Sequence, residues 1–341
     1  MIDNTTRDLI LAAEIAGYLH DLGKAHTGFA EEMLQGGQHL GKCCNIDQAH
    51  GAILEPGNPY HTDQSPQWPV LENLRQHPRW AKHLELPEAW IAPNTVQAHG
   101  LGDPLRQHHA GRTFPESELT LLGDLYAFGA DVRDSALDKG SGKVRGSRQP
   151  RDGAFISDTF GRQAQPYGPQ PLQAIWGQAI SLIEAVLFKD ANRPVPELRR
   201  RLLEGLEPLF RNALGETRRP TNDVTLHHHA YSTASLFKAA VAEGVLRGDF
   251  KRLQDHKGLF DFERMGQVRF RLLGIRWNWN ALTRDLLSPV AMTSLSLRRR
   301  EVLEQLRNLF EDEFPVGNVI YEDDDGVLML LPGFQEKDPE A

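Results

Sequence analysis

One apolar segment near the N-terminus constrains the fold most, because it ends in an adjacent histidine and aspartate. Residues 13–29 read AEIAGYLHDLGKAHTGF. Apolar residues recur here at helical spacing, starting just before the segment: Leu9, Ile10, Ala13, Ala16 and Leu19. The pattern predicts a helix with one face in a core, and Gly23 and Lys24 predict its end. His20 and Asp21 would then lie where the core meets a cleft.

An imidazole and a carboxylate from adjacent residues can bind one divalent cation together. A His-Asp pair is also a common dipeptide that packs or caps a helix, so the pair alone does not identify a metal site. Its context, LHDLGKAH, favours metal binding. Lys24 follows the pair by about one turn, where its ammonium could contact a phosphate.

The composition is that of an ordinary soluble globular protein with room for two domains. The chain has 341 residues, of which 40% are hydrophobic and 25% charged. A net charge of -8 argues against a uniform nucleic-acid coating, although the basic triplets 199–201 and 298–300 could act locally. Cys43 and Cys44 are adjacent, so no disulfide framework is expected. The polar N-terminus and the absence of long apolar runs predict a cytoplasmic protein without a membrane partner.

Beyond the first helix the sequence predicts a mainly α-helical protein with two irregular parts. Residues 35–118 read as a long irregular insert that carries many histidines, and 138–172 as a flexible loop. Short helices are predicted at 70–77 and 80–84, and longer ones at 119–137, 172–188, 196–213 and 226–246. Asn222 or Asp223 is the expected cap of the last of these helices.

From residue 267 the pattern changes to a strand at 268–275, a helix at 295–314 and a hairpin at 318–331. The hairpin turns at Asp323–Gly326, an Asp-Gly signal between apolar runs. This order makes half of a ferredoxin-like unit. We expect it to leave a sheet edge and an apolar face uncovered, and to resist proteolysis less than the preceding domain. The acidic residues 322–325 could hold metal, but a polar turn is the favoured interpretation.

Further residues are candidate metal ligands. The three histidines at 227–229 point to three sides of their helix, and His229 is preferred because small residues continue its face. A solvated helix start is the alternative for this stretch. Other candidates lie on loops or on a second helix: His99, His108, His109 and Asp131. Imidazole and carboxylate ligands suit Mn, Fe, Co or Ni better than Ca or Mg.

The order of these motifs resembles the large subunit of type III CRISPR effector complexes, specifically its Cmr-type variants. Five segments carry the resemblance: LHDLGK at 19–24, DSALDKG at 134–140, DVTLHHHAYSTASL at 223–236, FRLLGIRW at 270–277 and GNVIYEDDDGVLMLLP at 317–332. In the usual HD domain, the helix with the lone histidine precedes the His-Asp pair. Here the matching helix follows it, which indicates a circular permutation.

The resemblance implies a permuted HD-type helical metal-binding domain at 1–250 and a partial palm-like α+β domain at 251–341. It implies a metal-dependent single-stranded DNA nuclease in antiviral defence, with His20, Asp21 and Lys24 as catalytic residues. One or two ions, Mn or Ni, would be bound by a subset of these residues: His20, Asp21, His99, His108, His109, Asp131 and His229.

The implied partners are single-stranded DNA, the guide RNA and the other subunits of the effector complex. The family's Gly-Gly-Asp-Asp cyclase tetrad does not occur in this sequence, and the sequence ends within the first palm. The chain is therefore expected to be the N-terminal portion of such a subunit, without cyclase activity. Two alternatives stay open: a stand-alone HD phosphohydrolase that acts on small nucleotides, and an HD scaffold that has lost activity.

Overall fold

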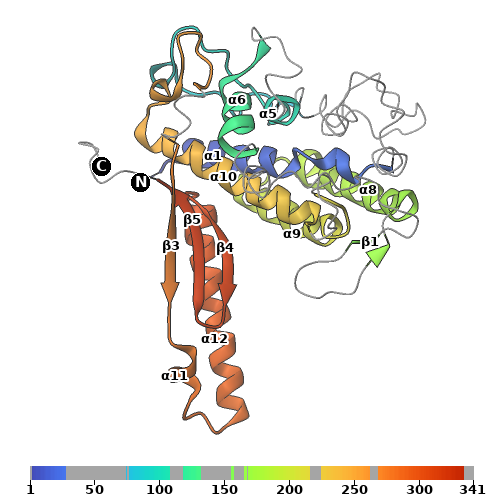
Figure 1. Cartoon of the computed structure of the whole chain (residues 1–341), viewed down its shortest axis with the longest axis vertical. Helices are drawn as coiled ribbons and strands as arrows, with labels where there is room; N and C mark the ends of the chain where they lie inside the picture. The colour runs from blue at the N-terminus through green and yellow to red at the C-terminus, as the bar shows by residue number, and fades with distance from the viewer. Residues whose placement is uncertain are drawn as a thin grey trace, which may run out of the picture.

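A helical body and a projecting arm make up the part of the chain that the structure describes (Figure 1). This computed structural model describes residues 2–27, 74, 77–107, 118–131, 155–156, 165–166, 168–215, 224–261 and 268–333. Within these ranges the chain is mainly helical and ends in a small three-stranded antiparallel sheet. The predicted mainly helical class is confirmed.

The first helix is present but lies earlier in the chain than the sequence predicted. Helix α1 runs over Asn4–Leu19, and the Asp3 carboxylate accepts a hydrogen bond from the Thr6 amide at its start. A 3₁₀ turn at Leu22–Ala25 follows. The predicted single helix to Phe29 was therefore wrong, because the α-helix ends immediately before the His-Asp pair. That pair lies between two helical pieces.

Helix α10, Leu226–Arg247, packs along α1 and confirms the helix predicted at 226–246. Thr225 caps it, in place of the predicted residue 222 or 223, because its hydroxyl accepts from the amide three residues later. Small residues let the two helices approach closely: a Cβ on Gly17 would lie 3.1 Å from the Cα of Ala234. These two helices form the centre of the body.

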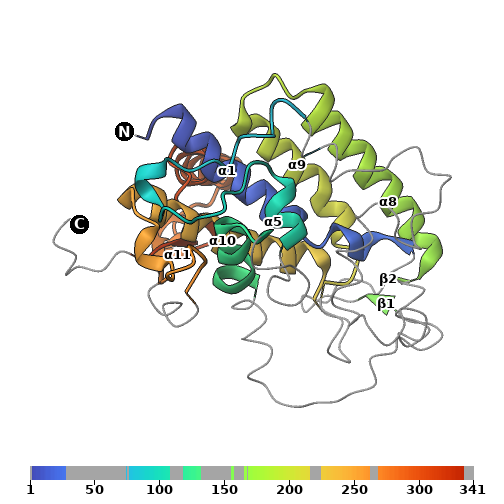
Figure 2. The same ribbon diagram turned by 90° about the horizontal axis from the view of Figure 1, so that it is seen from above.

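The other helices flank this central pair (Figure 2). On one side lie α8 (Pro169–Ile183), its π-helical continuation (Glu184–Lys189) and α9 (Val195–Phe210). Above the pair in Figure 1 lie α5 (Gly102–Gln107) and α6 (Leu121–Tyr126), which continues as a π-helical turn to Asp131.

Two of the sequence predictions for the body need correction. The predicted helix at 80–84 is a series of turns, and most of the one predicted at 70–77 lies outside the described residues. The predicted loop at 138–172 contains two short strands, β1 (Phe155–Ile156) and β2 (Gln165–Pro166), that pair with each other. Its last residues already belong to α8.

One helix of the body is long and apolar enough to cross a membrane, namely Gln170–Lys189. The sequence prediction that no such run exists overlooked it. The buried helix of a soluble protein passes the same test, and this helix is 44% buried and packs against α9. The feature is weak support for a membrane partner.

The arm contains β3 (Phe270–Arg276), α11 (Trp279–Thr283), α12 (Pro289–Arg307), β4 (Asn318–Asp323) and β5 (Gly326–Pro332). This confirms the predicted order of strand, helix and hairpin, although α12 begins six residues before the predicted start at 295. β5 lies between β3 and β4 and is antiparallel to both. β3 and β4 are therefore parallel to each other.

Helix α12 covers only one face of the arm's sheet. Its Leu303 packs against side chains of the sheet in a small second core: Val319, Val327 and Met329. On the opposite face, Leu272 and Tyr321 are 60% and 57% exposed. The uncovered apolar face expected from the sequence is thus present among the described residues.

A buried network of polar side chains, called the clamp below, attaches the arm to the body. Its members come from α1, α9, α10, the π-helical continuation of α12 (Asn308–Glu313) and the start of β4: Glu14, Arg199, Ser235, Lys238, Glu311, Asp312 and Asn318. All of them are buried. The clamp was not predicted from the sequence.

Glu14 lies at the centre of the clamp and is fully buried. Its Oε1 accepts from Arg199 Nη2 at 2.6 Å and from Asn318 Nδ2 at 2.8 Å, and its Oε2 from Arg199 Nε at 3.0 Å. Lys238 Nζ lies 2.8 Å from the same Oε2. Burial raises the pKa of this carboxyl, but the charges of Arg199 and Lys238 outweigh burial and hold the pKa below its ordinary value.

Candidate metal centre

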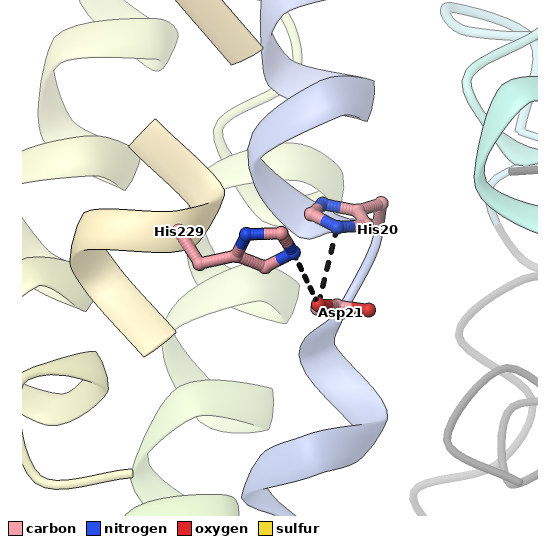
Figure 3. Close-up of side chains that lie close together, drawn as sticks. All are labelled: His20, Asp21 and His229. Atoms are coloured by element: carbon pink, nitrogen blue, oxygen red, sulfur yellow. Dashed lines mark ion pairs between the residues drawn. The ribbon is translucent and has the colours of Figure 1, made fainter. Parts of the chain in front are cut away.

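Three side chains from two segments far apart in the sequence, the end of α1 and the start of α10, meet at one point (Figure 3). Asp21 Oδ2 lies 3.2 Å from His20 Nε2 and 3.0 Å from His229 Nε2. One ligand atom from each residue lies within 4.8 Å of the others, which is close enough to share one ion. The predicted choice of His229 from three consecutive histidines agrees with this geometry.

The His20 ring is held in one tautomer by the backbone. Its Nδ1 lies 2.8 Å from the carbonyl oxygen of Gly17, and a carbonyl can only accept, so Nδ1 carries the proton. Its Nε2 then faces Asp21 Oδ2 at 3.2 Å. The Tyr126 hydroxyl donates to the same carbonyl at 3.2 Å, and its ring contacts the imidazole edge-on. An outer partner of this kind orients a metal-ligating histidine.

Lys24 is the fourth polar side chain at the centre. Its Nζ lies 2.6 Å from Asp21 Oδ2 and donates to the Gly215 carbonyl at 2.6 Å. All four side chains are nearly inaccessible: the whole residues His20, Asp21, Lys24 and His229 are 0%, 2%, 8% and 9% exposed. Burial keeps water away and strengthens each of these interactions.

Gly215 is needed at this position because the chain passes close to α10. Its amide donates to the Val224 carbonyl at 3.0 Å, next to the bridge between Leu214 and Thr225. A Cβ on Gly215 would lie 2.5 Å from the Thr225 carbonyl oxygen and 2.8 Å from the His229 Cβ. Any larger residue would push against His229.

The two neighbouring histidines serve other contacts, as expected for consecutive positions on a helix. His227 Nδ1 lies 2.9 Å from the Tyr18 hydroxyl, and His228 Nε2 lies 3.1 Å from an Arg211 nitrogen. His227 also lines a cleft of about 390 Å³ between α9, α10 and α12. No residue of the candidate centre lines this cleft.

Of the remaining predicted ligands, only His99 has a described side chain, and it lies apart from the three. His99 is a surface residue whose Nδ1 lies 3.0 Å from Glu85 Oε1, and it is not part of the group formed by the described residues. His108 and His109 lie outside the described residues. Asp131 ends the π-helical turn after α6, and its side chain is also outside the described part.

The acidic turn of the arm is occupied by arginine contacts. Asp324 Oδ1 lies 2.5 Å from Arg299 Nη1, and Asp325 Oδ2 lies 3.8 Å from Arg276 Nη2. The Asp325 side chain also accepts from the Trp279 amide at the start of α11. These contacts agree with the favoured interpretation of a polar hairpin turn.

Sequence reasoning missed the carbonyls of Gly17 and Gly215, which orient His20 and Lys24. Backbone carbonyls occur at every residue and carry no sequence signature, so only the two glycines were visible as a signal.

The donor set of two imidazoles and one carboxylate fits a divalent transition metal. Searches of known proteins found no matching family model, no matching curated protein and no matching solved structure.

Proposed function

We propose that this chain is a metal-dependent HD-type phosphohydrolase that cleaves single-stranded DNA. The observation that carries the proposal is the meeting of His20 and Asp21, after α1, with His229 on α10. A buried group of this composition is suited to a metal, because the Nε2 atoms of both imidazoles and Asp21 Oδ2 face one another, and metal binding would release any proton that these ligand atoms carry.

Each residue has a role in this proposal. His20, Asp21 and His229 would hold one divalent ion, Mn or Ni, and a second ion would need ligands such as Asp131, His108 or His109. A bound ion supplies an activated water and polarises a phosphoryl oxygen. Lys24 supplies a positive charge for the phosphate. The buried surroundings exclude bulk water from these contacts.

We further propose that the chain is the N-terminal part of a Cmr-type large subunit of a type III CRISPR effector complex in the cytoplasm. The ligand order supports this, since the lone-histidine helix α10 follows the His-Asp pair. The arm supports it too: β5 inserted between β3 and β4, with α12 on one face, is the arrangement of half a ferredoxin-like palm. Guide RNA and neighbouring subunits are then the partners.

Two other functions would use the same centre. A stand-alone nucleotide phosphohydrolase needs the metal but has no evident use for the arm. An inactive scaffold would keep the arm and need not keep the metal. Substrate preference therefore separates the first alternative from the proposal, and metal content separates the second.

The test combines metal content with cleavage by the whole chain. We expect Mn or Ni to copurify or bind in about one equivalent per chain. The variant Asp21→Ala should abolish binding, and the matched surface variant His99→Ala should leave it unchanged. With Mn, single-stranded DNA should be cut faster than duplex. Unchanged metal binding in Asp21→Ala would refute the site, and faster turnover of a free deoxynucleotide would favour the nucleotide hydrolase.

A further inference from the structure

Two imidazoles and one ammonium converge on a single carboxylate oxygen. Asp21 Oδ2 lies 3.0 Å from His229 Nε2, 3.2 Å from His20 Nε2 and 2.6 Å from Lys24 Nζ. The ammonium makes the shortest of the three contacts. The side chains of Asp21 and Lys24 are only 3% and 10% exposed, so little water screens their charges.

A second contact fixes the ammonium in place. Lys24 Nζ also donates to the Gly215 carbonyl at 2.6 Å, on the loop that precedes α10. The ammonium is therefore directed inward by two buried oxygen atoms. The ammonium thus contacts Asp21 Oδ2, the same oxygen that a metal ion at this centre would use as a ligand.

We propose that Lys24 is a built-in cation that neutralises Asp21 in the metal-free protein, and that a divalent metal ion must displace it from Oδ2. The inference rests on the proposed metal centre and deepens it. An ammonium and a divalent cation that share one oxygen repel each other strongly where water is excluded. Lys24 is thus a positioning residue that keeps the empty centre assembled and sets its metal affinity.

Displacement has a second consequence for the proposed reaction. Once the ammonium leaves Asp21, its charge is available to a phosphate group. Metal binding and phosphate binding are then coupled through one side chain. Metal affinity is lower than the three ligands alone would give, because binding must first break the contact between Lys24 and Asp21.

The test is calorimetric titration of the metal-stripped whole chain with Mn²⁺ alone. We expect Lys24→Gln and Lys24→Met to bind Mn²⁺ about tenfold tighter than the unmodified chain, the scale of outer-partner effects on metal sites. Gln keeps a donor for the Gly215 carbonyl, so it serves if Met disturbs folding. Lys24→Arg keeps the charge and should stay near the original affinity. Lys251→Met removes an exposed lysine and is the matched control.

The possible outcomes distinguish this inference from the proposed function. Equal or weaker Mn²⁺ binding by both neutral variants would overturn it and make Lys24 an outer support of the ligand. Tight binding by Lys24→Gln with none by the unmodified chain would support it strongly. If neither binds, or if Asp21→Ala binds as well as the unmodified chain, the metal centre itself is wrong and the inference falls with it.

Discussion

The clamp offers the sharpest prediction for stability, through the variant Glu14→Gln. An amide nitrogen in place of Oε2 would face two donors, Arg199 Nε at 3.0 Å and Lys238 Nζ at 2.8 Å, and could accept from neither. The variant also removes the carboxylate with which the buried Lys238 ammonium forms an ion pair. Breaking a buried ion pair costs about 3–5 kcal/mol, out of a total stability of about 5–15 kcal/mol.

Equilibrium unfolding in urea at neutral pH measures this loss. The exposed Glu204 on α9, with no ion-pair partner among the described residues, supplies the control Glu204→Gln, which should change stability by less than about 0.5 kcal/mol. The double variant Glu14→Gln with Lys238→Met removes one charge of each sign. It should therefore be less destabilised than the sum of the single variants, by about 1 kcal/mol or more. A loss below about 1 kcal/mol for Glu14→Gln would refute the account of the clamp.

Three further predictions concern other parts of the chain. Burial raises the pKa of Asp124 to about 7, although its Oδ2 accepts from the Phe260 amide, so the folded protein holds this proton more tightly than the unfolded one. The stability that this group contributes is fully present below its unfolded pKa and is lost as the pH rises through 7. Asp124→Asn should therefore stabilise the protein at pH 8 by roughly 1–2 kcal/mol in thermal or urea unfolding, and should flatten the pH dependence of its stability. Equal pH dependence of stability in the two proteins would contradict this. Gly215→Ala should weaken Mn²⁺ binding at least about tenfold in calorimetry, because its Cβ would press on His229; unchanged affinity would show that the loop yields. Limited proteolysis with mass mapping should cut the exposed tip at 282–290 before the clamped start of β4, and the reverse order would contradict the clamp.

The sequence predicted the parts of the fold that depend on local pattern. Apolar spacing located α10 within one residue, and the Asp-Gly turn located the hairpin of the arm. The predicted helix boundaries were wrong where two sequence signals competed. Thr225 and Asp223 are both good N-cap residues, and only the packed structure selects Thr225. The end of α1 was predicted wrongly because the apolar pattern of the sequence continues past Leu19, whereas the α-helical backbone ends there.

The candidate site was predictable in its ligands and not in its support. A His-Asp pair after an apolar helix and a histidine on a small-residue face identified three of the contacting side chains. The clamp left a clue in the sequence, because Glu14 and Lys238 are charged residues inside apolar runs and such residues must be paired when buried. Which partner each one meets depends on long-range packing. No local pattern specifies that Glu14 meets both Arg199 and Lys238.

The pairing of α1 with α10 also sets the order of events during synthesis. Tyr18 and His227 touch although they are 209 residues apart. At roughly 5–20 residues per second, a ribosome takes about 10–40 s to span such a gap. During that time the apolar face of α1 has no α10 to pack against, and His229 has not yet been synthesised to join His20 and Asp21. The centre therefore cannot form on an early nascent chain, and a nascent α1 is an obvious client for chaperones.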